Sequence, residues 1–444
     1  MANLLNPERS SSALNRLPQL RIGLLGFGTV GEGTYRMLED NLASIRRKTG
    51  ADLSVVRIGI RDEKKSRRAP RELFTADNMG IVIDPSIDLV VEAIGGIDPA
   101  LSLVEAALDH GKSVVTANKE MMAKHGARLL EKARAKQIDL HFEAAVGGGI
   151  PIVQVLKHQL AGNDVPMMMG ILNGTSNYIL TAMSQEGRPF DEVLAEAQLK
   201  GYAEADPTND VEGFDTMYKI SILASIVYGG PVPLESVHRE GITGVDAIDF
   251  EYADVLGYTI KLLGVAEELA DGSVRVRVHP AFVPKAHSLA SVNDVFNAVW
   301  FHGDFVGDLM FSGRGAGGDP TASAVVGDVI DVARNFAAKG TGSALPFDPP
   351  RAAAGMDDLV SRIYVRLDVL DKPNTLGRIS TAFGDHNVGL AAMEMRTTDA
   401  NHGEIAFLTH PVREAQFVAA LEAVEQLDVV YGVGNWIRAI EVTK

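Results

Sequence analysis

A glycine-rich turn near the start of the chain constrains the fold more than any other feature. Residues 26–31 have the spacing Gly-x-Gly-x-x-Gly, follow directly on the apolar segment 20–25, and precede a helical pattern from about residue 34. Between a strand and a helix, such glycines allow a tight turn and close approach of the backbone to a pyrophosphate at the helix N-terminus. The context predicts a dinucleotide-binding α/β unit, and a glycine-rich turn without a ligand is the alternative.

The alternation of strands and helices continues to about residue 150. Strands are expected at residues 53–60, 89–93, 113–116 and 138–143, with helices notably at residues 99–110 and 121–135. Alternating elements of this length favour a parallel, doubly wound sheet. We therefore expect a flexible tail over residues 1–19 and a Rossmann-type domain over residues 20–150.

The next part of the chain, residues 151–338, has a mixed pattern. Helices are expected at residues 152–160, 190–199 and 324–337, and β-like segments at residues 166–172 and 273–278. This mixture predicts a second, α+β domain, whose last helix returns to the first domain.

A stretch rich in glycine and proline, residues 339–360, is typical of a linker. The compact unit beyond it, residues 361–444, alternates strands and helices in a fixed order. The expected elements are a strand at 363–370, a helix at 375–383, strands at 390–397 and 404–409, a helix at 414–425 and a strand at 437–442. The order βαββαβ predicts a ferredoxin-like unit.

An unusually acidic segment, residues 201–219, carries five carboxylates within twelve residues and ends in a lysine. The apolar residues 220–227 follow it, so we expect a loop that leads into a buried helix. Asp215 and Lys219 then lie one turn apart on one face. Such a surface suits the ammonium group of an amino acid and supplies an amine for proton transfer. An ordinary helical ion pair, and loop capping by Asp206 and Asp210 beside Pro207, are the alternatives.

Composition excludes several classes of function. A net charge of −16 argues against nucleic-acid and anionic-membrane partners. The chain has no cysteine, which excludes disulfides, thiolate catalysis and cysteine-ligated metals. It has no apolar run of the roughly 18 residues that a membrane span needs, and its N-terminus lacks the apolar core of a signal peptide. A cytoplasmic protein is expected.

The cofactor preference depends on the residues after the second predicted strand. A strict NAD site usually places an acid at the end of this strand to hold the ribose 2′-hydroxyl. Here Arg61 follows the strand, with Lys64 and Lys65 close behind. These cations suit a 2′-phosphate, so NADP(H) is favoured, with NAD(H) as the other cofactor. A solvated basic loop is the alternative.

Six segments together resemble one family, the homoserine dehydrogenases. They are residues 26–31, 116–119, 143–151, 170–180, 201–219 and 315–324. The tail beyond residue 360 is similar to an ACT domain. The resemblance implies NAD(P)-dependent interconversion of L-homoserine and L-aspartate 4-semialdehyde, in the biosynthesis of threonine, methionine and isoleucine. It also implies that the second domain serves catalysis and dimerisation. Two residues depart from the family pattern: Arg314 replaces a proline, and Asn374 replaces a glycine of ligand-binding ACT domains.

Oxidation of a primary alcohol requires a hydride acceptor and a base for the hydroxyl proton. Lysine is the plausible proton carrier, and its ordinary pKa of about 10.4 must be lowered by burial or by a second ammonium group. We assign the acid/base role to Lys219 in the family's catalytic segment, with Asp215 to orient it. By resemblance Lys119 is a cofactor contact and a second catalytic residue.

The resemblance also implies roles for other residues. Glu204 is expected at the substrate ammonium, and Gly174 and Thr175 at the substrate carboxylate. Asp206, Asp210 and Asp215 are expected to orient the substrate or Lys219, and Asp210 and Lys219 also count among the substrate-binding residues. The expected cofactor contacts are Gly26, Phe27, Gly28, Thr29, Val30, Gly31, Arg61, Gly95, Lys119 and Gly317. A sodium site is expected from the carboxylate of Glu143 and the carbonyl groups of Val146, Gly148 and Ile150. A glycine-rich hinge without a metal is the alternative for this last group.

The resemblance leaves further alternatives open. A catalytically inactive amino-acid sensor and a different dehydrogenase on the same nucleotide fold are the two other functions. A homodimer or homotetramer is expected. Feedback inhibition by threonine is a hypothesis that rests on the ACT-like tail, and another amino acid or no effector is equally consistent with the sequence.

Overall fold

The computed structural model of the chain describes residues 17–62, 67–342, 347–398 and 401–440. The predicted tail therefore lies outside the described residues up to residue 16, as do Lys64, Lys65 and residues 343–346 of the linker. The chain divides into two compact units. The first comprises residues 1–116, 129–141 and 325–344, and the second comprises residues 117–128, 142–324 and 345–444.

The first unit is built on a six-stranded sheet in the order β3-β2-β1-β4-β5-β6, in which every neighbouring pair is parallel. Its elements are β1 (Gln19–Leu25), α1 (Thr29–Asp40), α2 (Leu42–Thr49), β2 (Asp52–Gly59), β3 (Phe74–Thr75), α3 (Asn78–Ile83), β4 (Leu89–Glu92), α4 (Ala100–Asp109), β5 (Ser113–Thr116) and β6 (Leu140–His141). Every residue of β4 is buried, as expected for a parallel strand covered on both faces. The predicted Rossmann-type sheet is confirmed.

The order of strands fixes where this sheet binds ligands. β1 lies between β2 and β4, so successive connections leave it towards opposite edges of the sheet. Ligands of doubly wound sheets bind at the carboxyl ends of the strands at such a switch point. The turn after β1 and the loops after β2 and β4 share this end because the strands are parallel.

The second unit contains a mixed sheet in the order β12-β11-β7-β9-β10-β17-β13-β15-β14. Its first half consists of β7 (Met167–Ile171), β9 (Tyr258–Glu268), β10 (Val274–Pro284), β11 (Phe296–Gly303) and β12 (Gly307–Arg314). The helices that lie wholly in this unit are a π-helix (Val155–Gln159), α6 (Gly174–Glu186), α7 (Phe190–Leu199), α8 (Thr208–Val211), α9 (Phe214–Val227) and α10 (Ala247–Val255). Two further helices, α5 (Lys119–Lys136) and α11 (Gly318–Ala338), begin in the second unit and end in the first. The predicted α+β pattern is confirmed.

Two expectations for this part of the chain were incomplete. The strand predicted at residues 273–278 extends over all of β10, and β9, β11 and β12 were not predicted. Ten of the eleven residues of β10 are buried, so the strand lacks the alternation that marks a half-exposed strand. The helix predicted at residues 324–337 begins earlier, at Gly318.

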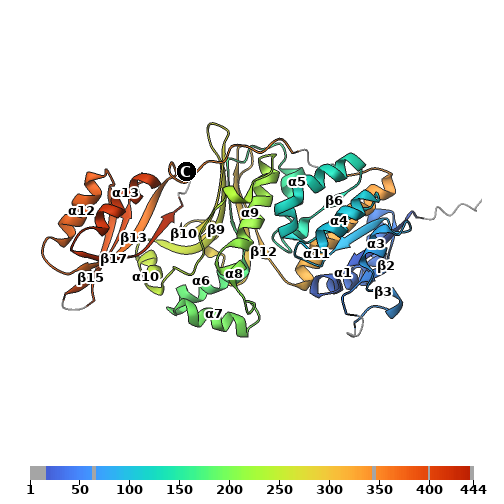
Figure 1. Cartoon of the computed structure of the whole chain (residues 1–444), viewed down its shortest axis with the longest axis horizontal. Coiled ribbons are helices and arrows are strands. Elements are labelled where there is room, and N and C mark those ends of the chain that lie inside the picture. The colour runs from blue at the N-terminus through green and yellow to red at the C-terminus, as the bar shows by residue number, and fades with distance from the viewer. Residues whose placement is uncertain (1–16, 63–66, 343–346, 399–400, 441–444) are drawn as a thin grey trace, which may run out of the picture. The chain divides into compact units, whose positions relative to one another are not determined.

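The C-terminal half of this sheet has the predicted βαββαβ order. Its elements are β13 (Val360–Leu370), α12 (Thr375–Asp385), β14 (Leu390–Thr397), β15 (His402–Thr409), α13 (Glu414–Glu425) and β17 (Val430–Ala439). In Figure 1, α12 and α13 cover one face of these strands. Phe383 of α12, Phe407 of β15 and Phe417 of α13 belong to one buried hydrophobic cluster. The last strand begins seven residues earlier than predicted. Its first part contains Gly432 and Gly434 and still pairs with β13.

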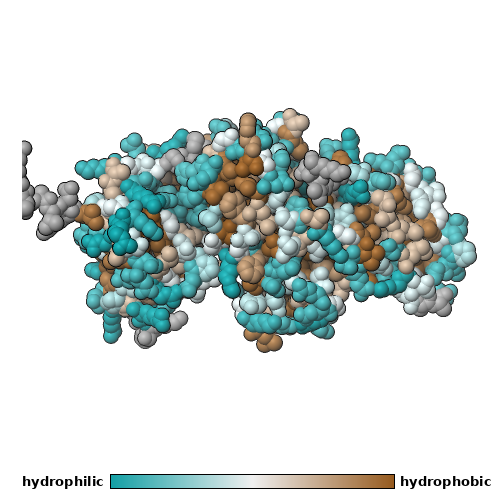
Figure 2. Space-filling view, turned by 180° about the vertical axis from the view of Figure 1, so that it is seen from behind, coloured by the Kyte–Doolittle hydropathy of each residue, from teal (hydrophilic) through white to brown (hydrophobic). Residues whose placement is uncertain are grey.

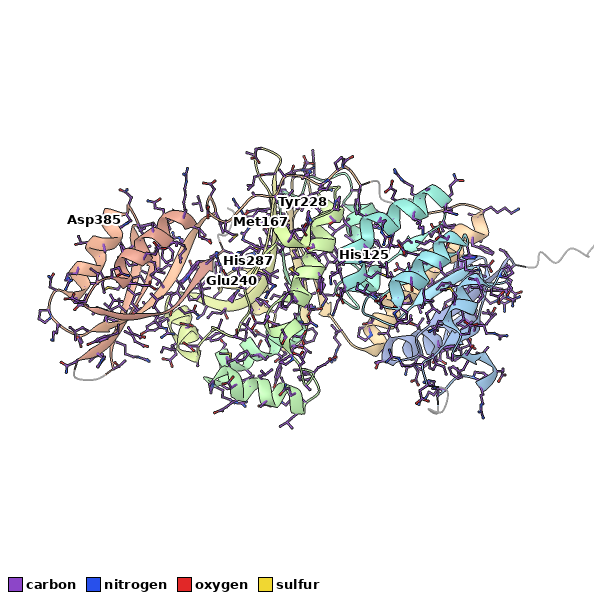
Figure 3. All side chains as sticks on the ribbon, viewed as in Figure 1. His125, Met167, Tyr228, Glu240, His287 and Asp385 are labelled. Carbon is purple, nitrogen blue, oxygen red and sulfur yellow. The ribbon has the colours of Figure 1, made fainter. Side chains whose placement is uncertain are left out.

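The sheet of the C-terminal half joins the rest of the second unit through β17, which pairs in parallel with β10. Arg438 of β17 is buried and contacts Glu414 and Glu240, the latter marked in Figure 3. Next to this pair, the rings of Phe282 and Tyr364 stack with centroids 4.5 Å apart. The junction therefore combines a shared sheet with buried charge pairs.

The surface seen in Figure 2 is mostly hydrophilic, and hydrophobic residues gather in brown patches, the clearest of them in the upper middle of the view. A few large apolar side chains are strongly exposed, among them Leu199 and Phe305. None of the helices that the structure describes is long and apolar enough to cross a membrane.

Candidate active site

The centre of the candidate site is Asp215, near the start of α9. Gly213 precedes the helix in a left-handed conformation (φ 79°), and Asp215 and Lys219 follow on its buried face. Lys219 Nζ donates to Asp215 Oδ2 at 2.6 Å and to the carbonyl oxygen of Leu172 at 2.7 Å. The predicted contact across one helical turn is therefore present.

A second lysine completes this cluster from a distant part of the sequence. Lys119, three residues after the end of β5 and at the start of α5, forms an ion pair with Asp215 Oδ1. The two oxygens of one buried carboxylate thus serve two ammonium groups. The side chain of Lys119 is 44% exposed and that of Lys219 only 8%. We name Lys119, Asp215 and Lys219 the lysine–aspartate cluster.

The electrostatics of the cluster separate the two lysines. Burial lowers the pKa of Lys219, and the ammonium group of Lys119 lowers it further, although Asp215 partly offsets both. Burial alone would lower the pKa of Lys119 as well. The carboxylates of Asp215, Asp210 and Glu204 outweigh this effect, so the pKa of Lys119 is raised. Burial opposes the charge on Asp215, yet the two ammonium groups hold its pKa well below the ordinary value. Lys219 is therefore the member that loses a proton more easily.

Asn173 connects the cluster to the N-terminus of α6. Its amide nitrogen donates to Asp215 Oδ2 at 2.9 Å and to Asp210 Oδ1 at 2.6 Å. Its amide oxygen accepts from the backbone N–H of Ser176 at 2.8 Å, which makes Asn173 the N-cap of α6. One side chain thereby fixes the position of a helix end relative to two carboxylates.

The predicted carboxylate-binding residues, Gly174 and Thr175, are the first two residues of α6. A Cβ atom on Gly174 would lie 2.9 Å from the carbonyl oxygen of Val295, so no side chain fits there. The Thr175 hydroxyl donates to the carbonyl oxygen of Tyr202 at 2.7 Å. Free amides at the start of a helix attract anions, so this end can receive a carboxylate.

The remaining acidic residues separate into two groups. Asp210 is close to the cluster, and its pKa is raised by burial and by Asp215 against the hydrogen bond from Asn173. Glu204 is exposed but near enough to raise the pKa of Lys119. Asp206 accepts from the backbone N–H and the hydroxyl of Thr208. Its carboxylate caps the turn before α8, as the loop-capping alternative predicts.

In the first unit, the glycine-rich turn has the tight packing that a nucleotide-binding turn needs. Gly26 has a φ of 93°, and a Cβ atom there would lie 2.7 Å from the carbonyl oxygen of Ala93. A Cβ atom on Gly31 would lie 2.1 Å from the carbonyl oxygen of Gly26. Gly28 faces open space instead and is followed by the N-terminus of α1, so the turn leaves room for a pyrophosphate.

The other predicted cofactor contacts of this unit differ in their surroundings. The ring of Phe27 packs edge-on against Tyr35 and Phe74, so this residue offers a ligand its backbone rather than its ring. Thr29 and Val30 are the first residues of α1. Arg61 is exposed, two residues after β2. Lys64 and Lys65 lie outside the described residues.

Glu92, a residue that the sequence analysis missed, organises the loop of Gly95. It is fully buried at the end of β4, and its Oε1 accepts from the backbone N–H groups of Ile94 and Gly95 at 2.7 and 3.1 Å. Thr116 donates its hydroxyl to Oε2 at 2.5 Å. A carboxylate inside an apolar strand was the signal available in the sequence. Glu92 fixes the backbone of a loop at the ligand-binding end of the sheet.

The predicted cation-binding residues lie in one loop of the second unit. The buried carboxylate of Glu143 accepts from the backbone N–H groups of Ile152, Val153 and Gln154 at 2.7–2.9 Å. Burial raises its pKa, and these amides partly offset the effect. Gly148 is left-handed (φ 54°) and packs against the backbone of Gly315. Val146 and Ile150 are fully buried in the same loop. No group of three or more acidic or histidine side chains suited to a metal occurs among the described residues.

The second glycine-rich turn precedes α11. Gly317 has a φ of 120°, which requires glycine, and Arg314 is the exposed last residue of β12. In the C-terminal half, Asn374 has a left-handed φ of 74° at the start of α12. Asparagine tolerates this conformation better than most residues other than glycine.

Comparisons with known proteins agree with these observations. The family described as "Homoserine dehydrogenase" matches residues 151–330, "Homoserine dehydrogenase, NAD binding domain" matches residues 26–143, and "ACT domain" matches residues 363–429. A homoserine dehydrogenase of Synechocystis is 44% identical over 434 residues, which cover 95% of this chain and 99% of that protein.

Two solved structures extend the comparison. A homoserine dehydrogenase from Thiobacillus denitrificans has a TM-score of 0.90 and 40% identity, over 95% of this chain and 98% of that one. A hyperthermophilic archaeal homoserine dehydrogenase in complex with NADPH has a TM-score of 0.61 and 28% identity, over 71% of this chain and 97% of that one.

Proposed function

The chain belongs to the homoserine dehydrogenase family, and from this premise we propose that it interconverts L-homoserine and L-aspartate 4-semialdehyde with NAD(P)(H). The reaction belongs to the biosynthesis of threonine, methionine and isoleucine. The observation that carries the proposal is the lysine–aspartate cluster beside the N-terminus of α6. It combines a buried amine of lowered pKa with an anion-binding helix end and acidic side chains that suit an ammonium group.

The cofactor fits the first unit. The turn of Gly26, Gly28 and Gly31 supplies a cradle without side chains at the N-terminus of α1, and the loop of Gly95 is fixed by Glu92. A bound nicotinamide supplies the hydride chemistry. Gly317 and Lys119 are the residues of the second unit that we assign to the cofactor.

In the proposed mechanism Lys219 moves the proton. During oxidation its neutral amine takes the hydroxyl proton of the alcohol, and during reduction its ammonium returns a proton to the aldehyde oxygen. Two N–H groups of Lys219 are engaged by Asp215 and the carbonyl oxygen of Leu172, so the nitrogen is fixed in place. Lys119 assists by keeping the pKa of Lys219 low through its positive charge.

The substrate's other groups are held by charge. The α-carboxylate binds the backbone amides of Gly174 and Thr175 at the start of α6, where the helix dipole favours an anion. Glu204 and Asp210 hold the α-ammonium. Through its hydrogen bonds, Asn173 holds the start of α6 in a fixed position relative to the lysine–aspartate cluster.

Substitution of Lys219 by alanine tests this proposal. We expect loss of turnover of at least about 100-fold, the usual contribution of a positioned acid or base, with NADPH still bound in fluorescence titration. Lys200→Ala, which removes an exposed lysine bonded to Glu196 and Tyr178, is the matched control. Near-normal oxidation of NADPH with L-aspartate 4-semialdehyde in Lys219→Ala would refute the mechanism. A panel of malate, aspartate and homoserine distinguishes another dehydrogenase, and inactivity of the wild-type chain would favour the sensor.

We also propose that NADP(H) is preferred, with Arg61 at the 2′-phosphate. The support is the exposed guanidinium at the carboxyl end of β2, where a NAD site usually has an acid. Arg61→Asp should reverse the ratio of kcat/KM for the two cofactors, and Arg57→Asp, an exposed arginine within β2, should leave it unchanged. A wild-type chain that prefers NAD(H) would contradict this assignment.

A sodium ion is proposed at the loop of Glu143. One buried carboxylate and carbonyl groups from a loop with left-handed glycines form the oxygen-only donor set that suits a hard cation. Sodium chloride should raise the unfolding temperature above that in choline chloride of equal ionic strength, and Glu143→Gln should remove this difference. Equal unfolding temperatures in the two salts for the wild type would mean that Glu143 acts only as a cap of the backbone at residues 152–154.

For the C-terminal unit we propose an amino-acid effector, threonine, that inhibits the enzyme, and a homodimeric or homotetrameric assembly. The left-handed Asn374 at the start of α12 marks the loop that approaches the effector. Threonine should inhibit the wild type, and Asn374→Ala should weaken inhibition without changing kcat. Sedimentation measures the assembly. Unchanged turnover at saturating threonine would remove this part of the proposal.

A further inference from the structure

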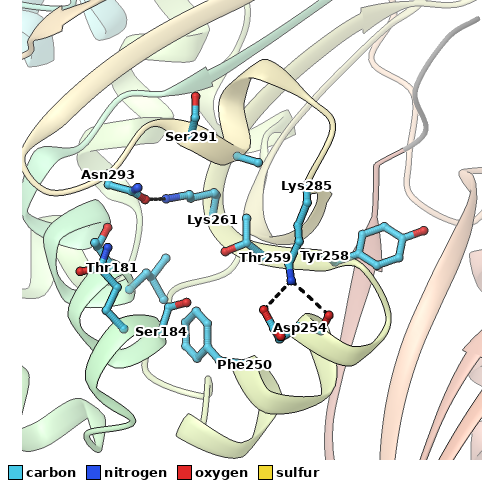
Figure 4. A pocket seen from close by; sticks show the side chains of 13 residues that line it. Thr181, Ser184, Phe250, Asp254, Tyr258, Thr259, Lys261, Lys285, Ser291 and Asn293 are labelled. Carbon is cyan, nitrogen blue, oxygen red and sulfur yellow. Dashed lines mark hydrogen bonds and ion pairs between the residues drawn. The ribbon is translucent and has the colours of Figure 1, made fainter.

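A cavity of about 260 Å³ lies in the second unit, away from the lysine–aspartate cluster. Figure 4 shows its walls, which come from α6, α10, the start of β9 and the short helix of residues 288–291. At about 30 Å³ for each water molecule of the liquid, the space corresponds to roughly nine waters. None of the described residues that line it belongs to the proposed active site, so the proposed reaction does not explain it.

The most unusual residue in its wall is Lys261 on β9, which is only 2% exposed. Its Nζ donates to the carbonyl oxygen of Val292 at 2.7 Å, to Asn293 Oδ1 at 2.9 Å and to Asn177 Oδ1 at 3.4 Å. All three acceptors are neutral. Within the described parts of the chain, no carboxylate oxygen lies within ion-pair distance of this nitrogen.

A buried ammonium group without a counter-charge is costly, because neutral hydrogen-bond acceptors do not cancel its charge. Burial lowers the pKa of Lys261 to about 8, and the carboxylate of Asp294 acts on it only from further away. Lys261 is therefore mostly charged at neutral pH. The second lysine of the wall, Lys285, is already paired with Asp254 at 2.5 Å (Figure 4), so the lining keeps one excess positive charge.

The remaining polar groups of the wall suit a small organic anion. The polar residues Ser184, Thr259 and Gln185 line the cavity. Phe250 and Leu180 supply an apolar surface of the size of a short carbon chain. A charged end, polar groups and an apolar wall together match a short carboxylate better than an inorganic anion.

We propose that this cavity binds a small carboxylate anion, whose charge is neutralised by Lys261. The site is independent of the proposed reaction and of the proposed effector loop at Asn374. A ligand there would contact α6, whose N-terminus carries Gly174, and α10, whose Asp249 is bonded to Arg366 of β13 at 3.0 Å.

Thermal unfolding of the full chain tests the proposal, with sodium propionate as the probe and sodium chloride of equal ionic strength as the reference. Propionate carries the carboxylate and a short apolar chain but no ammonium group. We expect a saturable rise of at least about 2 °C in unfolding temperature, and the same dissociation constant by calorimetry.

Two variants locate the site. Lys261→Met removes the ammonium group, and Ser184→Trp fills the mouth of the cavity from an exposed position on α6. Both should abolish the propionate effect, and Ser102→Trp, at an exposed serine of α4, should retain it. An L-threonine effect that Ser184→Trp also abolishes would extend the ligand class to α-amino acids and support the site. No saturable binding of propionate up to about 100 mM, or an equal effect in wild type and Ser184→Trp, would overturn the proposal.

Discussion

The shared carboxylate of Asp215 makes the acidity of Lys219 adjustable in both directions, which gives a sharp test of the mechanism. Asp215→Asn removes a negative charge that lies 2.6 Å from Lys219 Nζ. This charge favours the ammonium form of Lys219. At an effective dielectric constant of about 20, unit charges about 4 Å apart interact by about 4 kcal/mol, which equals about 3 pKa units. Since opposite charges usually shift a pKa by about 1–3 units, we expect the pKa of Lys219 to fall by that amount.

The sign of the effect on activity follows from the role of the amine. In the proposed mechanism, oxidation of L-homoserine needs neutral Lys219, so kcat should rise with pH through the pKa of this group in the enzyme–substrate complex. Asp215→Asn should move this rise to lower pH. Its plateau should fall as well, because a neutral amide holds the Lys219 amine less firmly than the carboxylate does.

Lys119→Met should move the same rise in the opposite direction. It removes an ammonium group that lowers the pKa of Lys219, so the rise should move to higher pH. The side chain of Lys119 is partly exposed, and screening by solvent limits this shift to about 1 unit. The assay is kcat for L-homoserine oxidation at saturating cofactor between about pH 6 and 10, the range that brackets a lowered lysine pKa.

The matched control is Asp206→Asn, which removes a carboxylate of the same segment. Among the described residues, this carboxylate accepts hydrogen bonds from Thr208 alone. Its pH profile should coincide with that of the wild type. Shifts of the same sign in Asp215→Asn and Lys119→Met, or no shift in either, would show that Lys219 is not the group that titrates.

Three further predictions concern the scaffold. Glu92→Ala leaves the amides of the Gly95 loop without their acceptor, so the KM for NADPH should rise by about 10-fold or more while the KM for L-homoserine changes little. Gly31→Ala places a Cβ atom 2.1 Å from a carbonyl oxygen and should lower the unfolding temperature in calorimetry, whereas Gly28→Ala, which meets nothing within 4 Å, should not. Despite the opposing effect of burial, His238 and Arg438 lower the pKa of Glu240 to about 2. The stability that Glu240 contributes is therefore present above the ordinary glutamate pKa of about 4.3 and is lost as pH falls towards 2. The difference in unfolding free energy between wild type and Glu240→Gln should shrink over that interval in urea titrations.

Local sequence signals predicted those parts of the fold in which one segment determines its own structure. The glycine spacing of residues 26–31 predicted the Rossmann-type sheet, because this spacing is typical of the turn between the first strand and the first helix of such a sheet. The spacing of Asp215 and Lys219 predicted their contact, because residues four positions apart in a helix lie on the same face. β9 gave no such signal, because most of its residues are buried and its apolar residues do not alternate. In β10 only the alternating segment at its start was predicted, and the apolar residues that follow it do not alternate.

Contacts between distant segments could not be predicted in this way. The ion pair of Lys119 with Asp215 joins residues separated by almost a hundred positions, and spacing carries no information on such a pair. Asn173 was part of a recognised segment, yet its bonds to two carboxylates depend on how α6 and α9 pack. Glu92 was missed because a single acid within an apolar strand shows neither its partners nor its burial.

In the proposed mechanism one lysine transfers the proton, and the arrangement of the cluster gives the second lysine a different role. A single buried Lys219 beside Asp215 would form a strong ion pair, and the carboxylate would keep the amine protonated at neutral pH. Lys119 shares the same carboxylate and adds a positive charge, so it weakens the hold of Asp215 on the Lys219 proton without removing the oxygen that orients the nitrogen. Asp215 thereby acts on both the orientation and the acidity of Lys219, whereas Lys119 acts on the acidity alone. Substitution of Lys119 can therefore change the acidity while the hydrogen bond from Lys219 to Asp215 is retained.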